Sequence, residues 1–134
     1  MDGAAGETLE TSPVLTGLVS TMADAVSALE TYVAAANRVA GARLKTAEGR
    51  PDRKALEREQ HMAHGLSWIA TYLEALRQTA EWAARLETDG KFGEIEALLS
   101  QILFSEYFAQ LVGGVPMNQG ETIRPHELGL LVEV

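Results

Sequence analysis

Two histidines and a glutamate lie close together in the sequence, at spacings that could bind a metal ion. Glu57 and His61 are four residues apart and His64 follows three residues later, so on a helix the three side chains share one flank. A di-iron bundle needs Glu-x-x-His on two helices and two further glutamates, but Gln60 stands three residues after Glu57. Metal binding by Glu57, His61 and His64 is therefore a weak prediction, and a solvated or interface flank with a Glu57–His61 pair is favoured.

Glu106 is the charged residue of the apolar segment FSEYFAQ. An isolated buried carboxylate is costly, so we expect Glu106 to be a buried charge that is paired, interfacial or functional. The expected partner is Arg77, Arg85 or an arginine of another subunit. A single glutamate does not make an acid–base pair. The structural role is therefore favoured, and no catalytic residue is predicted.

The segment GGVPMNQG follows this apolar stretch and contains three glycines. Glycine-rich turns can offer backbone N–H groups to an anion, which makes Gly113 and Gly114 weak candidates for cofactor binding. No lysine or helix start follows in the arrangement of a phosphate loop. Termination of a helix by Gly113 and Gly114 is the favoured interpretation, because glycine adopts the left-handed conformation without a steric penalty.

These residues must be positioned by helices, because apolar residues recur three or four positions apart along most of the chain. This periodicity predicts an all-α fold, an antiparallel bundle of three long helices at about 13–46, 53–88 and 92–112. A short C-terminal helical turn is expected near Pro125 to Leu128. The third helix is apolar nearly all round, which is typical of a helix buried on more than one side.

Local signals set the expected boundaries of these helices. Ser12 can cap the first helix, with Pro13 at its first position. Gly49 and Pro51 break the chain before Asp52, which offers a fresh N-cap. A turn is expected at Asp89-Gly90, and Gly65 is the weak point of the second helix.

Three regions follow from this organisation. Residues 1–11 are polar and lack periodicity, so a flexible tail is expected there. Residues 12–129 form the expected helical bundle domain. Residues 130–134 make an apolar end without a stop signal, as though the natural chain were truncated there.

Composition excludes several classes of protein. The 134 residues include no cysteine, which rules out disulfides, thiolate metal sites and a cysteine nucleophile. Nineteen acidic against 11 basic residues give a formal charge of −8, which disfavours nucleic acid and anionic membranes as partners. The start has no signal-peptide pattern and no segment has the length of a membrane span. A cytoplasmic location is therefore expected.

From Gln60 to Leu128 the order of features resembles the C-terminal helical domain of acyl-CoA dehydrogenases. The matching elements are Gln60 to His64, WIATYLEALRQTAEWAARL, Asp89-Gly90, Ser105-Glu106 and Gly113-Gly114. Within that family, residues 53–129 are most similar to an extra N-terminal helical extension carried by one group of bacterial flavoenzymes.

The resemblance implies a bundle packed on, or ahead of, a dehydrogenase core that binds FAD and a CoA thioester. The family's catalytic glutamate lies beyond the Gly-Gly loop, where Glu121, Glu127 and Glu133 lack its sequence setting. The chain alone is therefore expected to bind no flavin and to catalyse nothing, with FAD held by the parent protein. Its expected role is packing and oligomerisation, with a second copy or a dehydrogenase core as partner. The alternatives are a stand-alone helical interaction module and, less favoured, a metal-binding bundle.

Overall fold

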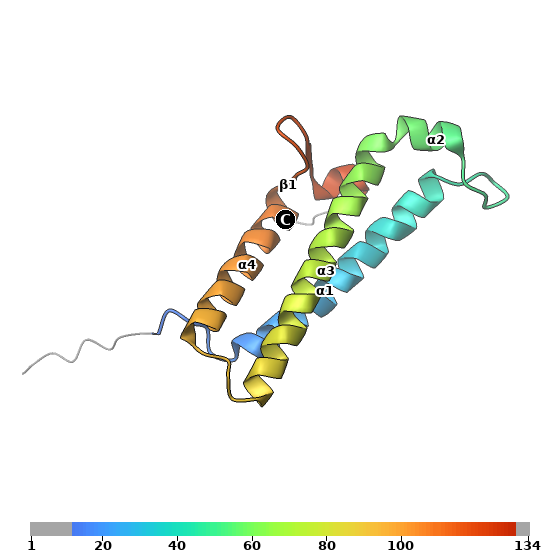
Figure 1. The fold of residues 1–134 in the computed structure, drawn as a ribbon. Coiled ribbons are helices and arrows are strands. Elements are labelled where there is room, and N and C mark those ends of the chain that lie inside the picture. The colour runs from blue at the N-terminus through green and yellow to red at the C-terminus, as the bar shows by residue number, and fades with distance from the viewer. Residues whose placement is uncertain (1–11, 131–134) are drawn as a thin grey trace, which may run out of the picture.

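The computed structural model describes residues 12–130 and confirms the all-α class (Figure 1). The predicted tail at 1–11 and most of the apolar end, 131–134, lie outside the described residues. The elements, in chain order, are α1 (Leu18–Arg43), α2 (Arg53–Arg58), α3 (Gln60–Thr88), α4 (Glu94–Gly113), β1 (Val115–Pro116), β2 (Thr122–Ile123) and the 3₁₀ helix η1 (Pro125–Leu128).

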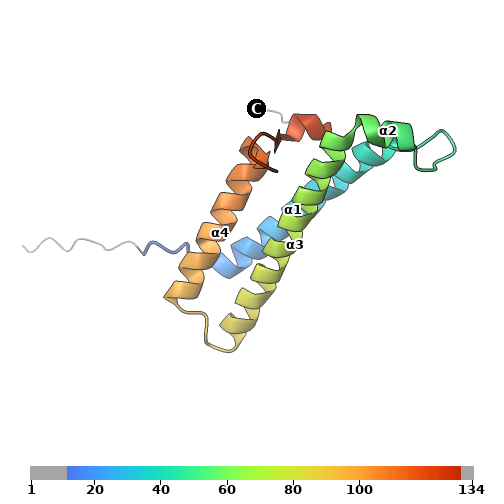
Figure 2. The same cartoon turned by 45° about the horizontal axis from the view of Figure 1, so that its top comes forward.

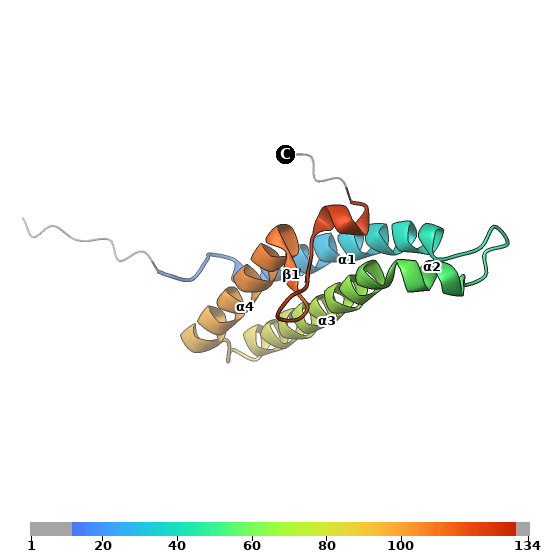
Figure 3. The same ribbon diagram turned by 90° about the horizontal axis from the view of Figure 1, so that it is seen from above.

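The three long helices are antiparallel to their chain neighbours, and α1 crosses behind α3 in the view of Figure 1 (Figures 1 and 2). The closest pairing is between α1 and α3, whereas α4 packs mainly on α3 and touches α1 less. Seen from above, η1 lies against the pair formed by α1 and α3 (Figure 3). Within the described residues, no helix is both long and apolar enough to cross a membrane.

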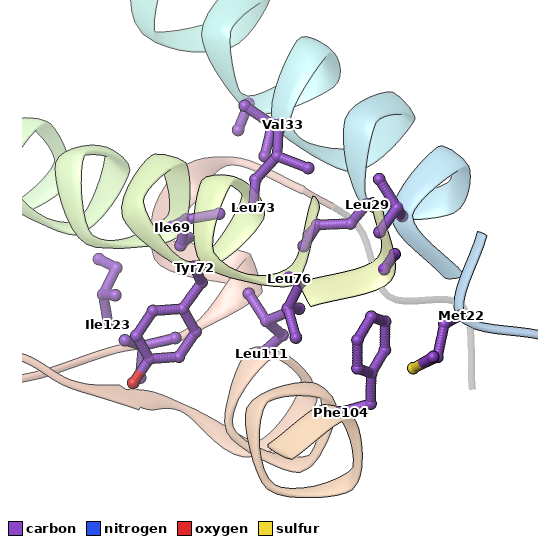
Figure 4. Packing of buried hydrophobic residues seen from close by; sticks show 14 of the residues in the cluster. Met22, Leu29, Val33, Ile69, Tyr72, Leu73, Leu76, Phe104, Leu111 and Ile123 are labelled. Atoms are coloured by element: carbon purple, nitrogen blue, oxygen red, sulfur yellow. The ribbon is translucent and has the colours of Figure 1, made fainter. Parts of the chain in front are cut away.

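One apolar core joins these elements (Figure 4). Leu76 of α3 is completely buried at its centre. The buried side chains around it come from α1, α3, α4 and the segment after α4, and they include Met22, Leu29, Val33, Ile69, Leu73, Phe104, Leu111 and Ile123. The predicted short turn after α4 is confirmed as η1, whose Leu128 is also buried in this core.

The first helix begins at Leu18, so the prediction of a start at residue 13 with Ser12 as N-cap is wrong. Gly17 precedes the helix in the left-handed conformation, with φ of 69°, which a helix interior does not contain. The chain before it is held on α4 instead, because the side-chain amide of Gln101 binds the backbone of Pro13 and Leu15 at 2.9 and 2.8 Å.

The predicted second helix is divided at Glu59 into α2 and α3. Asp52 is confirmed as the N-cap of α2, where its carboxylate accepts the backbone N–H groups of Lys54 and Ala55 at 2.9 and 3.2 Å. The break does not fall at Gly65, which stays helical. The sequence has neither glycine nor proline at Glu59, and apolar residues keep their helical spacing on both sides of it. The break therefore could not be predicted from the sequence.

The third helix ends at Gly113 instead of residue 112, and Gly114 follows with φ of 134°, a conformation that favours glycine. Its start is at Glu94 instead of residue 92, because Gly93 takes the extended N-cap position and its N–H donates to the Glu96 carboxylate at 3.1 Å. Between this helix and η1, residues 115–123 form a small antiparallel hairpin that pairs Val115 with Ile123.

Candidate functional site

The segment after α4 folds back over the N-terminal half of α3, and we call residues 114–130 the C-terminal clasp. It comprises β1, β2 and η1, which contact α3 (Figures 1 and 3). Val115, Ile123 and Leu128 of the clasp are each 1% exposed. The clasp is therefore part of the core and places its polar side chains beside the predicted histidine flank.

Gly65 is the point of closest approach between α3 and the clasp. A Cβ atom at this position would lie 2.8 Å from Cβ of Ile123 and closer still to its Cγ1 atom. Carbon atoms in contact are normally about 3.5–4.0 Å apart. Ile123 thus packs directly on the backbone of α3 at Gly65, in the space that a side chain there would occupy.

Each histidine of the predicted metal flank is paired with a glutamate of the clasp. His61 Nε2 lies 3.3 Å from Glu127 Oε1, and His64 Nδ1 lies 3.8 Å from Glu121 Oε2. The Nε2 atom of His64 accepts the indole N–H of Trp68 at 3.0 Å, so in the neutral ring the proton is on Nδ1 and faces Glu121. These two contacts therefore connect the clasp to α3.

The structure does not bring Glu57, His61 and His64 together as a metal site. Glu57 pairs with Arg53, with Nε and Oε1 3.3 Å apart, so the predicted Glu57–His61 pair is wrong. Over residues 12–130 no group of three or more histidine, cysteine, aspartate or glutamate side chains is arranged to hold a metal ion.

Glu127 is the most electrostatically engaged group of the clasp. Its Oε2 accepts the backbone N–H of Arg124 at 2.8 Å, and its Oε1 faces His61. The Arg124 N–H, followed by the charges of His61, His126 and Arg124, lowers the pKa of the Glu127 carboxyl. A depressed pKa means that the ionised carboxylate stabilises the folded state.

Acid is therefore expected to loosen η1 before the α1–α3 pair. The stabilisation from Glu127 is fully present above the unfolded pKa of a glutamate, about 4.3, and is lost as the pH falls through the lower folded pKa. Amide NMR signals of residues 124–130 should move in this window before those of α1. In the Glu127→Gln variant this early movement of the residue 124–130 signals should be absent. If the signals still move early in that variant, Glu127 is not the group that causes the change.

Aromatic side chains connect the clasp end of α3 to α4. Trp68 and Tyr72 meet edge to face with ring centroids 6.4 Å apart, and Tyr72 stacks on Tyr107 of α4 at 4.2 Å. The Tyr72 hydroxyl donates to the side-chain oxygen of Gln110. Burial, and then the neighbouring Tyr107, raise the pKa of Tyr72. The cluster is therefore suited to packing, since the Tyr72 hydroxyl is kept protonated and hydrogen-bonded.

The loop at Gly113 and Gly114 does not fit the phosphate groups of a flavin. The N–H of Gly114 donates to the Gln110 carbonyl at 2.7 Å, and that of Met117 donates to the Glu121 carbonyl at 2.9 Å. A Cβ atom on Gly114 would lie 2.6 Å from Cγ2 of Thr122. These glycines end α4 and admit the hairpin, which is the structural interpretation favoured from the sequence.

Glu106 is exposed on α4, so the expectation that it is buried within this chain is wrong. Arg77, one expected partner, is bound instead by Glu30 of α1 at 2.9 Å and by Glu74. The role of Glu106 at an interface with another molecule or domain stays a prediction.

Large apolar side chains on the same helix as Glu106 are exposed as well. Ile95, Leu99, Ile102 and Val112 are 58–72% exposed. The helix expected to be buried on more than one side is thus buried on one, where Ala97, Phe104 and Leu111 face α1 and α3.

A groove of about 430 Å³ lies between α1, α4 and η1. Tyr32 lines it, and the hydroxyl group of this residue is buried without a hydrogen-bond partner within the described chain. Burial also raises the pKa of Tyr32. The other lining side chains are mainly apolar: Ala28, Leu29, Ala35, Phe108, Leu111, Val112, Pro125 and Leu130.

Tyr32→Phe is expected to raise the free energy of unfolding by about 1 kcal/mol, because it removes a buried hydroxyl that has lost its water and gained no partner. Urea denaturation of the two proteins measures the change. Tyr72→Phe is the matched control and should be destabilising by a similar amount, because the Tyr72 hydroxyl donates to Gln110. A loss of stability in Tyr32→Phe would show that its hydroxyl has a partner.

Fold and site together define an all-α helical domain closed by a clasp, whose glutamates lie beside two histidines of α3. No family model matches the chain. Over 118 residues, which are 88% of the chain, it is 48% identical to (2S)-methylsuccinyl-CoA dehydrogenase from Cereibacter sphaeroides. The predicted resemblance to a helical part of an acyl-CoA dehydrogenase is confirmed. The chain spans 21% of that relative, about a fifth of its length.

Proposed function

We propose that this chain is a non-catalytic helical domain of an acyl-CoA dehydrogenase-like flavoenzyme, and that it serves packing and oligomerisation. The observation that carries the proposal is the 48% identity over nearly the whole chain to one fifth of a dehydrogenase. The clasp supports it, because its glutamates contact the histidines of α3 and its loop N–H groups are engaged within the chain.

The proposal includes the properties of a parent protein. FAD would be bound by a dehydrogenase core, with residues 12–129 as a separate bundle domain, equivalent to an N-terminal extension, in a cytoplasmic enzyme. Packing on that core, on a second copy, or on both would cover the exposed apolar side of α4.

A chimeric enzyme tests this proposal. The segment of the Cereibacter sphaeroides dehydrogenase that matches this chain is replaced by residues 12–129, and flavin content and turnover are compared with those of the parent enzyme. Retention of both is expected, whereas the chain expressed alone should carry no flavin absorbance. An unrelated three-helix bundle in the same place is the control. A chimera with no more flavin or turnover than this control, or a chain that catalyses dehydrogenation alone, would overturn the proposal.

The second candidate is a stand-alone helical interaction module, which the exposed apolar residues of α4 favour. The coding frame after Val134 discriminates the two: a dehydrogenase core encoded in frame supports the first candidate, and a stop codon favours the second. Stoichiometric metal in protein purified without chelators would instead favour a metal-binding bundle.

A further inference from the structure

One row of side chains on α4 faces away from the rest of the chain. Ile95, Leu99, Ile102, Glu106 and Ala109, which we call the α4 outer face, are all exposed. They are spaced four, three, four and three residues apart, and they lie on the opposite side of the helix from the buried residues. This is the heptad spacing with which one helix presents a continuous seam to another helix.

Glu106 supplies the only charge in this row. None of the residues of α4, from Glu94 to Gly113, is basic, and three of them are glutamates. Glu106 makes no ion pair within residues 12–130. A helix that covers the row would desolvate this carboxylate, so it must bring a cation to the same place.

The row continues into a groove of about 380 Å³ between α3 and α4. Leu99 belongs to both, and Trp82 of α3, which is 38% exposed, lines the groove together with Leu103. Ser100 also lines it and is 2% exposed. Its hydroxyl is buried without a hydrogen-bond partner in the described chain. A side chain of a docked helix has room here.

We propose that the α4 outer face docks an amphipathic helix of the dehydrogenase core, one with apolar residues at heptad spacing and an arginine or lysine opposite Glu106. This proposal rests on the proposed function. The relative's remaining length supplies such a core, since this chain spans 21% of it. A second copy docked through the same face is disfavoured, because two α4 helices would bury two Glu106 carboxylates and bring no cation.

The test uses the chimeric dehydrogenase described above, with a photo-crosslinking phenylalanine analogue in place of Ile102. The expected result is a crosslink, located by mass spectrometry, to one helix of the core with a basic residue within one turn of the attachment point. The analogue at Glu81, an exposed residue of α3, is the control and should give no such product.

A charge exchange then tests the role of Glu106. Glu106→Arg should lower the crosslinking yield from position 102 by about 10-fold or more, since two positive charges would then face each other in the contact. Replacement of the basic residue at the crosslinked site by glutamate should restore the yield in the Glu106→Arg background. Glu81→Arg is the matched control and should change nothing.

These outcomes separate the docking proposal from the proposed function. A chimera with flavin and turnover that gives no crosslink, a crosslink to a loop, or a crosslink between two α4 helices would overturn the docking proposal alone. A crosslinking yield unaffected by Glu106→Arg would overturn the assignment of a basic partner. A chimera without flavin or turnover would overturn the proposed function, and the docking proposal with it.

Discussion

Gly65→Ala is expected to destabilise the protein by about 1–3 kcal/mol, although alanine is the better helix former by about 1 kcal/mol. The reason is the contact at the clasp. The added methyl group would lie 2.8 Å from Cβ of Ile123, and Ile123 is 1% exposed and therefore has little room to move. Either the clasp lifts from α3 or α3 bends, and both lose buried apolar area.

Urea denaturation of the wild-type chain and this variant measures the loss, and hydrogen exchange shows where it falls. Amides of the clasp should lose protection more than those of α1. Gly41→Ala is the matched control, also within a helix, where a Cβ atom would meet only Lys45 Nζ at 3.9 Å. That change should stabilise by about 0.5–1 kcal/mol. Equal stabilisation by Gly65→Ala and Gly41→Ala would contradict the close packing of Ile123 on Gly65.

A shortened side chain at position 123 provides a second check on the same contact. Ile123→Ala destabilises by itself because it opens a cavity. Combined with Gly65→Ala it should cost less than the sum of the two single changes, because the new methyl group enters the space that the isoleucine vacates. Additive losses would show that the two residues do not compete for one place.

The helices could be predicted because their cause is local. Apolar residues three and four positions apart, with breaks at Gly49 and Asp89-Gly90, define them without knowledge of the partner surfaces. The start at Leu18 and the hairpin were missed because contacts distant in sequence decide them. Gln101 hydrogen-bonds to the backbone of residues 13 and 15, which are not helical. The hairpin depends on the packing of Ile123 against Gly65.

The candidate site shows the same division. His61 and His64 could be selected from their type and spacing, but their partners could not, because Glu121 and Glu127 reach them only when the clasp folds back on α3. Glu106 stands out in the sequence as an unusual charge in an apolar segment. Its exposure could not be foreseen, since periodicity defines an apolar side without stating what covers it.

Leu76→Ala and Leu99→Ala remove the same atoms from two helices, and their contrast measures how much of α4 is uncovered. Leu76 is fully buried and Leu99 is 61% exposed. We expect Leu76→Ala to cost about 2–5 kcal/mol, because it opens a cavity where α1, α3 and α4 meet.

Leu99→Ala should change the free energy of unfolding of the chain by about 0.5 kcal/mol or less, since this side chain buries little area. Thermal unfolding at several protein concentrations measures both variants. If the chain covers α4 by self-association, the effect of Leu99→Ala will grow with concentration, because the dimer and not the monomer loses the contact. An effect that is small at every concentration leaves the outer side of α4 free for a different partner, as the docking proposal requires.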